Sequence, residues 1–365
     1  SSAALCVCIP LFILVLSSCG QDNGPQEKAG NSDSASGSRS SNQESGIPSV
    51  KGVVSATDTA DAQPVEVRID SLTLAYRVRV GDVFSYKVTQ HNRISEGKNG
   101  AEDNMVYYYT KRITSVIPDS AITMTMRFDR IVMNSIVPSR DSTGKMVYRS
   151  VRYNSADAAD RKKANFMRFT ALIGHEAIIK ITPNGDVIDI QNVEPVAEKI
   201  IAAFQDSLTS DQKKIVTQEI SVNVYAMIHR QEFLQMYPQK PLDSTRTWKA
   251  NYDAPLAGIF PSENVVTYKL DRVINMKGRN VAEITATLKS NVREKKRSNN
   301  YGTIVLKSGN ISGGSKHLVD LDKGFTILKK YMLSVDVEVV TTDNQTKQSL
   351  TTKQKTSSDI TVELL

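Results

Sequence analysis

Side chains that could carry catalysis or bind a metal are scattered along the 365-residue chain. His175-Glu176 begins like a zinc-protease motif, but Ile179 stands where the second histidine ligand is required. The glycine-rich stretch 309–313 holds a serine but lacks the Gly-x-Ser-x-Gly order of a hydrolase elbow. The four histidines show no metal-ligand spacing: His91, His175, His229 and His317. We therefore expect no catalytic residue, no metal site, no cofactor and no enzymatic activity.

The three cysteines, Cys6, Cys8 and Cys19, all lie in the first twenty residues, so the rest of the chain contains no disulfide or thiolate site. Residues 3–16 form an uncharged apolar run that is too short to span a bilayer and has the length of a signal-peptide core. Leu16-Ser17-Ser18-Cys19 follows it and resembles the lipobox of bacterial lipoproteins.

The lipobox resemblance implies a signal peptide at 1–18, cleavage before Cys19, and acyl chains on that cysteine. Three acyl chains would anchor a protein firmly, because each buried CH₂ contributes ~0.8 kcal/mol. Gly20 follows the cysteine, and by the family's sorting rule the absence of Asp there favours the outer membrane. The alternative is an uncleaved membrane segment that ends in cysteine.

Residues 19–63 are expected to form a tether, because they are rich in Ser, Gly, Asn and Asp and poor in large apolar side chains. The tether carries a net charge of about −3, so the remaining chain is basic, given a total of +7. A basic body could bind nucleic acid, an anionic lipid surface or an acidic glycan. Nucleic acid is disfavoured, because the chain is exported and has no aromatic residues interleaved with its basic run at 293–297.

The body alternates apolar and polar residues in many short runs, as half-buried antiparallel strands do. Two stretches, 64–191 and 243–365, show the same order of short similarities, such as Tyr109–Ile113 with Lys269–Val273. We therefore predict a mainly β (α+β) chain with two similar antiparallel curved sheets or half-barrels.

A helical insert is expected between the halves, at 192–242. Apolar residues recur at helical spacing from Val193 to Phe204, after Asn192 as a candidate cap and with Pro195 in the first turn. A second helix is expected after Thr209-Ser210 and before Pro238. Two helices would cover the apolar face of a curved sheet.

The chain resembles an uncharacterised group of bacterial lipoproteins whose repeat contains a Gly-Asp-x-Phe/Trp strand start and an Asn-Gly or Lys-Gly hairpin. The matching positions here are Gly81–Phe84, Asn184-Gly185 and Lys323-Gly324. More distantly, a sheet curled over helices is similar to the lipoprotein-carrier (LolA/LolB-like) fold, whose concave face holds acyl chains. That likeness concerns the fold alone, which does not establish function.

These patterns predict a lipid-anchored protein of the cell envelope that binds a hydrophobic ligand or an envelope protein on a concave apolar sheet face. Adaptable methionines and large aromatic rings are suited to such a face. Two alternatives remain: a structural interaction module without a pocket, and a hydrolase whose site is assembled from distant residues. The residues expected to face a ligand are Phe84, Tyr86, Met124, Met126, Phe128 and Trp248.

Overall fold

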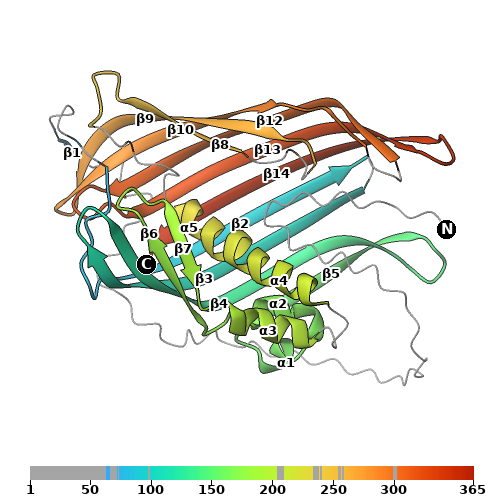
Figure 1. Cartoon of the computed structure of the whole chain (residues 1–365), viewed down its shortest axis with the longest axis horizontal. Coiled ribbons are helices and arrows are strands. Elements are labelled where there is room, and N and C mark those ends of the chain that lie inside the picture. Colours follow the sequence, from blue (N-terminus) through green and yellow to red (C-terminus); the bar gives the residue numbers. More distant parts are fainter. Residues whose placement is uncertain are drawn as a thin grey trace, which may run out of the picture.

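Long antiparallel strands and a small group of helices make up the chain in its computed structural model (Figure 1). The structure describes residues 63–65, 72, 74–97, 99–203, 209–232, 238, 241–253, 256, 259–298 and 302–365. The predicted lipobox, Leu16, Ser17, Ser18 and Cys19, lies outside these residues, and so does nearly all of the predicted tether.

The named strands belong to one 14-stranded sheet, and they pair antiparallel throughout. Its main path runs in the order β1-β9-β10-β12-β13-β14-β2-β3-β4-β6-β7, while β8, β5 and β11 pair with β9, β4 and β12. The strands are β1 (Gln63–Pro64), β2 (Val83–Glu96), β3 (Asn99–Ile117), β4 (Ala121–Arg140), β5 (Met146–Asn154), β6 (Glu176–Ile181), β7 (Val187–Gln191), β8 (Thr247–Asp253), β9 (Ser262–Met276), β10 (Arg279–Val292), β11 (Lys296–Ser298), β12 (Gly302–Asp320), β13 (Thr326–Asp343) and β14 (Ser349–Leu364).

The prediction of a mainly β chain with antiparallel sheet is confirmed, and the two halves turn out to share one sheet. The last strand, β14, pairs along its length with β2, the first long strand, with Val362 opposite Val88 and Ser357 opposite Arg93. Strand order repeats between the halves, since β2-β3-β4-β6-β7 corresponds to β8-β9-β10-β12-β13. Hairpin register does not repeat: Ile113 opposes Met124, whereas Val273 opposes Ala282.

Short helical segments follow β5 and β7 in the described part of the chain, and the predicted helical insert is confirmed. After β5 come α1 (Ala158–Arg161), η3 (Ala164–Phe166) and α2 (Met167–Thr170). After β7 come α3 (Glu194–Ala203), α4 (Ser210–Glu219), the π-helical η4 (Ile220–Ala226) and α5 (Met227–Glu232). Helix α3 buries Val196, Ala197, Ile200 and Ile201, the side chains at the expected helical spacing. Asn192 donates its side-chain amide to the carbonyl of Glu176, which ties the helix start to β6.

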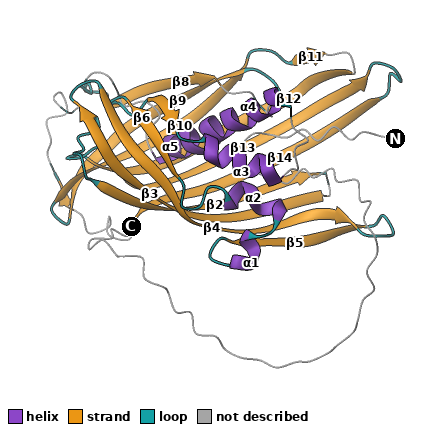
Figure 2. Cartoon of the chain, turned by 60° about the horizontal axis from the view of Figure 1, so that its bottom comes forward, coloured by secondary structure: helices purple, strands orange, loops and turns teal. Residues whose placement is uncertain are grey.

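The helices lie on the side toward which the sheet curves, and this side is called the inner face (Figures 1 and 2). Strand alternation sorts side chains between the two faces, because successive residues point in opposite directions. On β2, Phe84, Tyr86 and Val88 are buried while Lys87 and Thr89 are more exposed. Even-numbered residues of β2 and β14 and odd-numbered residues of β3 therefore point inward.

At the end of the core near β7, the backbone of residues 74–78 packs closely against the turns at residues 183 and 323–324. The segment 74–78 joins the two halves, since the Tyr76 amide donates to Pro183 and the Arg77 amide donates to Lys323. Gly324 has a positive φ of 73°, and a Cβ built on it would lie 1.9 Å from the Ala75 carbonyl oxygen. Only glycine fits at this position.

Candidate ligand-binding face

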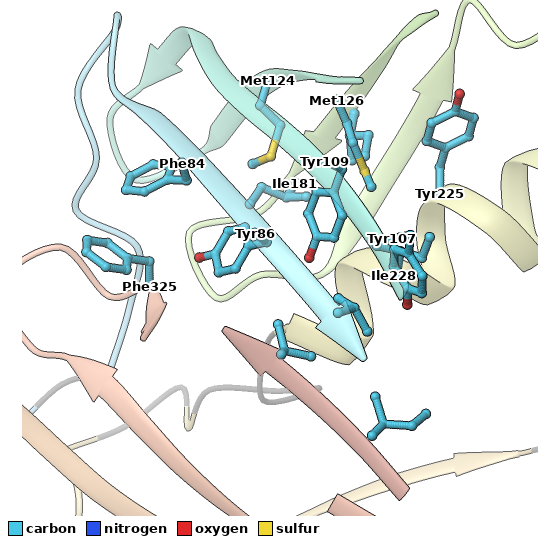
Figure 3. Close-up of a cluster of buried hydrophobic side chains, with 14 of the residues drawn as sticks. Phe84, Tyr86, Tyr107, Tyr109, Met124, Met126, Ile181, Tyr225, Ile228 and Phe325 are labelled. Carbon is cyan, nitrogen blue, oxygen red and sulfur yellow. The ribbon is translucent and has the colours of Figure 1, made fainter. Parts of the chain in front are cut away.

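Five of the six residues predicted to face a ligand are packed in the core beside the helices, and Figure 3 shows four of them, Phe84, Tyr86, Met124 and Met126. Phe84 contacts the ring of Phe325, with ring centroids 4.8 Å apart. The Tyr86 hydroxyl donates to the Thr326 carbonyl at 3.1 Å, and Phe128 contacts Tyr225 of η4. Their apolar surface is already covered by protein, so we assign these side chains to packing. The buried residues concerned are Phe84, Tyr86, Met124, Met126 and Phe128.

Trp248, the sixth residue, is also buried in the core and lies on the inner face of the other half. Its ring stacks on Tyr268, with centroids 5.2 Å apart and planes 15° from parallel. It is the only tryptophan of the chain, which makes it a built-in fluorescent reporter for this part of the inner face.

A continuous row of side chains crosses the inner face of eight neighbouring strands. Each member lies directly opposite the next in the strand register, so all members share one face. Neighbouring strands are ~4.8 Å apart, so the row is roughly 34 Å long. From β9 to β4 its members are Val266, Leu288, Gly313, Leu333, Ser358, Asn92, Asp103 and Ser135, and we call them the inner-face row.

The inner-face row changes character between β13 and β14, one strand before the junction of the two halves. From β9 to β13 it is apolar and half-buried, with Val266, Leu288 and Leu333 around a glycine. From β14 to β4 it is polar, and Ser358, Asn92 and Ser135 are buried. A row that is apolar at one end and polar at the other is complementary to an amphiphile, a molecule with an apolar chain and a polar head group.

The polar half of the row and its inward-facing neighbours on β2 and β14 keep unused hydrogen-bonding capacity. Gln90 donates its amide to Asn92 at 3.1 Å. Within the part of the chain that the structure describes, the Gln90 carbonyl oxygen and the hydroxyls of Ser358 and Thr356 are buried without a hydrogen-bond partner. A buried polar group without a partner costs about 1–3 kcal/mol, so these atoms favour a polar group placed against them.

Asp103 is the acidic member of the row. Burial raises the pKa of its carboxyl group, while the hydrogen bond that Ser135 donates to it acts in the opposite direction. The carboxyl group is therefore easier to protonate than an exposed aspartate, and a protonated carboxyl group can itself donate a hydrogen bond.

A second polar cluster lies four residues along β12 and β13 from the apolar half of the row. His317 opposes Lys329 in the register, and its Nε2 lies 2.7 Å from the Ser315 hydroxyl. Burial, together with the charge of Lys329, holds the pKa of His317 well below its usual range. The imidazole is therefore neutral at pH 7, and its Nδ1 has no hydrogen-bond partner among the described residues.

The structure keeps the four histidines apart. His91 contacts Glu102 on β3, and the His175 Nε2 lies 2.5 Å from the Asn192 carbonyl oxygen. His229 of α5 lies 3.0 Å from the Lys111 ammonium through Nδ1 and 3.0 Å from the Gly185 carbonyl through Nε2. Within the described ranges, no three His, Cys, Asp or Glu side chains are grouped closely enough to hold a metal ion. The expectation that the protein is not an enzyme stays a prediction.

Sequence reasoning missed the inner-face row, although part of its signal is visible in the sequence. Gln90 and Asn92 continue the inward phase that Phe84, Tyr86 and Val88 begin. Polar residues on the apolar phase of an alternating strand indicate a buried polar position. The sequence alone could not predict that these residues form one continuous row, because the row depends on how eight strands pair.

Comparisons with solved structures give only low similarities. Lipovitellin, from a structure of its lipid–protein interactions, matches with 9% identity and a TM-score of 0.43, covering 79% of this chain and 25% of lipovitellin. An outer membrane channel from Pseudomonas putida F1 matches with 8% identity and a TM-score of 0.17, covering 82% of this chain and 100% of the channel. This chain therefore spans a quarter of the lipovitellin chain, and neither similarity is high enough to support an argument about fold or function.

No curated protein matches the sequence. Among the described residues, no helix combines the length and the apolar character needed to cross a membrane. One family model matches residues 119–326, from the start of β4 through the helices to the start of β13. Because that match covers more than half of the chain, the protein belongs to this family of unknown function, DUF6263.

Proposed function

We propose that the protein binds an amphiphilic molecule along the inner-face row, as a non-enzymatic component of the cell envelope. The observation that supports this proposal is the change from apolar to polar along one register-aligned row. The apolar part would lie against Val266, Leu288 and Leu333, and the polar part would meet Ser358 and Asn92.

The energetics favour an elongated molecule over a compact one. The apolar half spans three strand gaps, about 14 Å, which suits an extended chain of roughly ten or more carbons. Burying each CH₂ contributes about 0.8 kcal/mol, so such a chain supplies most of the affinity. The buried hydroxyls and amides of the polar half then fix which end of the molecule lies over β14 and β2.

The location belongs to the same proposal and depends on the sequence. Acyl chains at Cys19 would hold the body at the outer membrane, on the tether of residues 20–63. Metabolic labelling with palmitate that is lost in Cys19→Ala tests this part. It is independent of the ligand, because Cys19 is not part of the inner-face row.

Quenching of Trp248 fluorescence by brominated fatty acids tests the ligand site in the purified full chain. Trp248 lies two residues from Ala250, which opposes Val266 at the apolar end of the row. We expect a fatty acid brominated near its methyl end to quench Trp248 at least twice as strongly as one brominated near its carboxyl group. Equal quenching by the two probes would contradict the proposed orientation.

Two substitutions at neighbouring glycines give the test a matched control. Gly313→Leu fills the row: a Cβ at Gly313 would lie 3.0 Å from the Met332 carbonyl oxygen and 3.5 Å from the Leu288 Cβ, so β13 must shift by a few tenths of an ångström to admit it. Gly314→Leu adds the same side chain on the opposite face, where the nearest atom is 3.7 Å away. We expect Gly313→Leu to weaken binding of the brominated fatty acids about tenfold or more and Gly314→Leu to leave it unchanged, with circular dichroism as the folding check.

Ser358→Ala tests whether the Ser358 hydroxyl contributes to ligand affinity and not to the stability of the free protein. Removing a buried hydroxyl without a partner should leave the free protein equally stable or about 1 kcal/mol more stable, while the affinity for an amphiphile falls several-fold. If both glycine variants and Ser358→Ala bind like the parent, the inner-face row is not a ligand site, and the interaction-module alternative is favoured.

A further inference from the structure

A second candidate surface lies on the outer face, at the opposite side of the molecule from β8. Strands β4 and β5 form a hairpin whose far part, residues 134–152, we call the flap. Among the named strands β5 pairs only with β4, so it forms a margin of the sheet (Figure 2). The flap carries none of the residues of the inner-face row except Ser135, which lies opposite Val151 of β5.

The outer face of the flap exposes a group of apolar side chains. Pro138 opposes Tyr148, and Ile136 and Met146 are their neighbours on the same face. Ile136 is 43% exposed, Met146 38% and Tyr148 53%. Several of the large apolar side chains that the structure leaves exposed are thus gathered on one hairpin, and exposed apolar groups of this kind mark interaction surfaces.

Cations surround this apolar group. Arg140 and Arg152 lie on the same face, at its two ends, and Lys145 lies in the turn. Within the described chain none of them forms an ion pair with a carboxylate; Arg140 donates to the Gly144 carbonyl instead. The single acid of the flap, Asp141, accepts hydrogen bonds from Thr143 and Lys145 within its own turn.

The neighbouring strand does not neutralise the flap. Glu102 of β3 lies opposite Ile136, and its carboxylate is already 2.6 Å from the His91 imidazole. The surface therefore combines a central tyrosine and aliphatic groups with a rim of cations. Aromatic rings prefer the headgroup region of a bilayer, and Lys and Arg are attracted to anionic lipids.

We propose that the outer face of the flap docks on a bilayer that contains anionic lipids, with Tyr148 and Ile136 in the headgroup region and Arg140, Lys145 and Arg152 against lipid phosphates. Charge complementarity favours this partner over a second copy of the chain, since two like-charged flaps would repel each other. Docking would set the orientation of the body at the membrane, whatever attaches its N-terminus.

Depth-dependent fluorescence quenching tests the proposal in the full chain bound to vesicles. Tyr148→Trp places a reporter on the flap, and Leu350→Trp places one at a matched exposed site at the start of β14, where Leu350 is 67% exposed. The parent, with Trp248 alone, gives the background. Vesicles contain brominated phosphatidylcholine with or without phosphatidylglycerol as the anionic lipid.

We expect bromine to quench the added fluorescence of Tyr148→Trp by at least half in vesicles with phosphatidylglycerol, and only weakly in neutral vesicles or in concentrated salt. The added fluorescence of Leu350→Trp should be quenched little in both. Combining Arg140→Glu and Lys145→Glu with Tyr148→Trp should abolish the quenching, while Lys347→Glu, near the control site, should not. Equal quenching of the two reporters, quenching unaffected by salt, or cross-linked dimers through β5 in place of quenching would overturn the proposal.

Discussion

At the scale of single residues, buried polar side chains separate this chain from an ordinary sheet core. Gln90, Asn92, Thr356 and Ser358 occupy positions where their strands elsewhere carry aromatic or branched apolar side chains. Polar groups cost free energy at such positions unless they are hydrogen-bonded. Their grouping on adjacent strands, β2 and β14, is therefore more informative than any one of them.

His317 makes stability depend on pH in a defined direction. Its pKa is held well below 6.5 in the folded state by burial and by Lys329, so only the unfolded chain binds its proton near pH 6. Stability contributed by the neutral ring is fully present well above pH 6.5 and is lost as the pH falls through 6.5, with a slope that rises to at most about 1.4 kcal/mol per pH unit. We expect His317→Gln to flatten this dependence in urea unfolding between about pH 6.5 and 5.5. A parent-like slope in His317→Gln would show that other groups dominate the pH response.

At the scale of elements, helix α5 is fixed to the sheet by a polar contact in an apolar setting. His229 is buried and joins the Lys111 ammonium of β3 to the carbonyl of Gly185, in the turn between β6 and β7. Gly185 has a positive φ of 91°, which places its carbonyl in this turn at little conformational cost. Three elements therefore meet at one imidazole.

We expect His229→Phe to lower the free energy of unfolding by about 2 kcal/mol, because a buried ammonium and a buried carbonyl each lose a partner. Chemical denaturation measures this change. Adding Lys111→Met should recover part of the loss, since it removes the buried charge. A double variant less stable than His229→Phe alone would show that Lys111 contributes mainly through other contacts.

At the scale of the whole molecule, the junction of β14 with β2 makes the two halves one sheet. Its paired residues lie far apart in sequence, as Val362 and Val88 do, so the junction depends on long-range pairing that forms slowly. The inner-face row crosses this junction from Ser358 to Asn92, one strand after it changes from apolar to polar between Leu333 and Ser358. A ligand bound along the row would contact both halves.

A disulfide across the junction tests this arrangement. Ser95 opposes Lys355, and both are exposed. In a chain whose three native cysteines are replaced by serine, Ser95→Cys with Lys355→Cys should cross-link nearly completely on oxidation and shift gel mobility. Closing so long a loop should add roughly 5 kcal/mol to the free energy of unfolding in the chain-entropy model. Ser95→Cys with Lys353→Cys is out of register and should cross-link poorly; equal cross-linking would contradict the pairing.

Local patterns in the sequence determined the mainly β class and the helical insert, because strand alternation and helical spacing are short-range signals. Val196, Ile200 and Ile201 were placed correctly on the buried side of α3 for this reason. Strand alternation also predicted that Phe84, Tyr86 and Met124 point inward. Whether such side chains contact a ligand or other protein atoms depends on what covers them. Only the tertiary structure decided that η4, Phe325 and neighbouring aromatic rings contact them. Only the register of eight strands could align Val266 with Ser135 on one row, since no local pattern encodes which distant strands become neighbours.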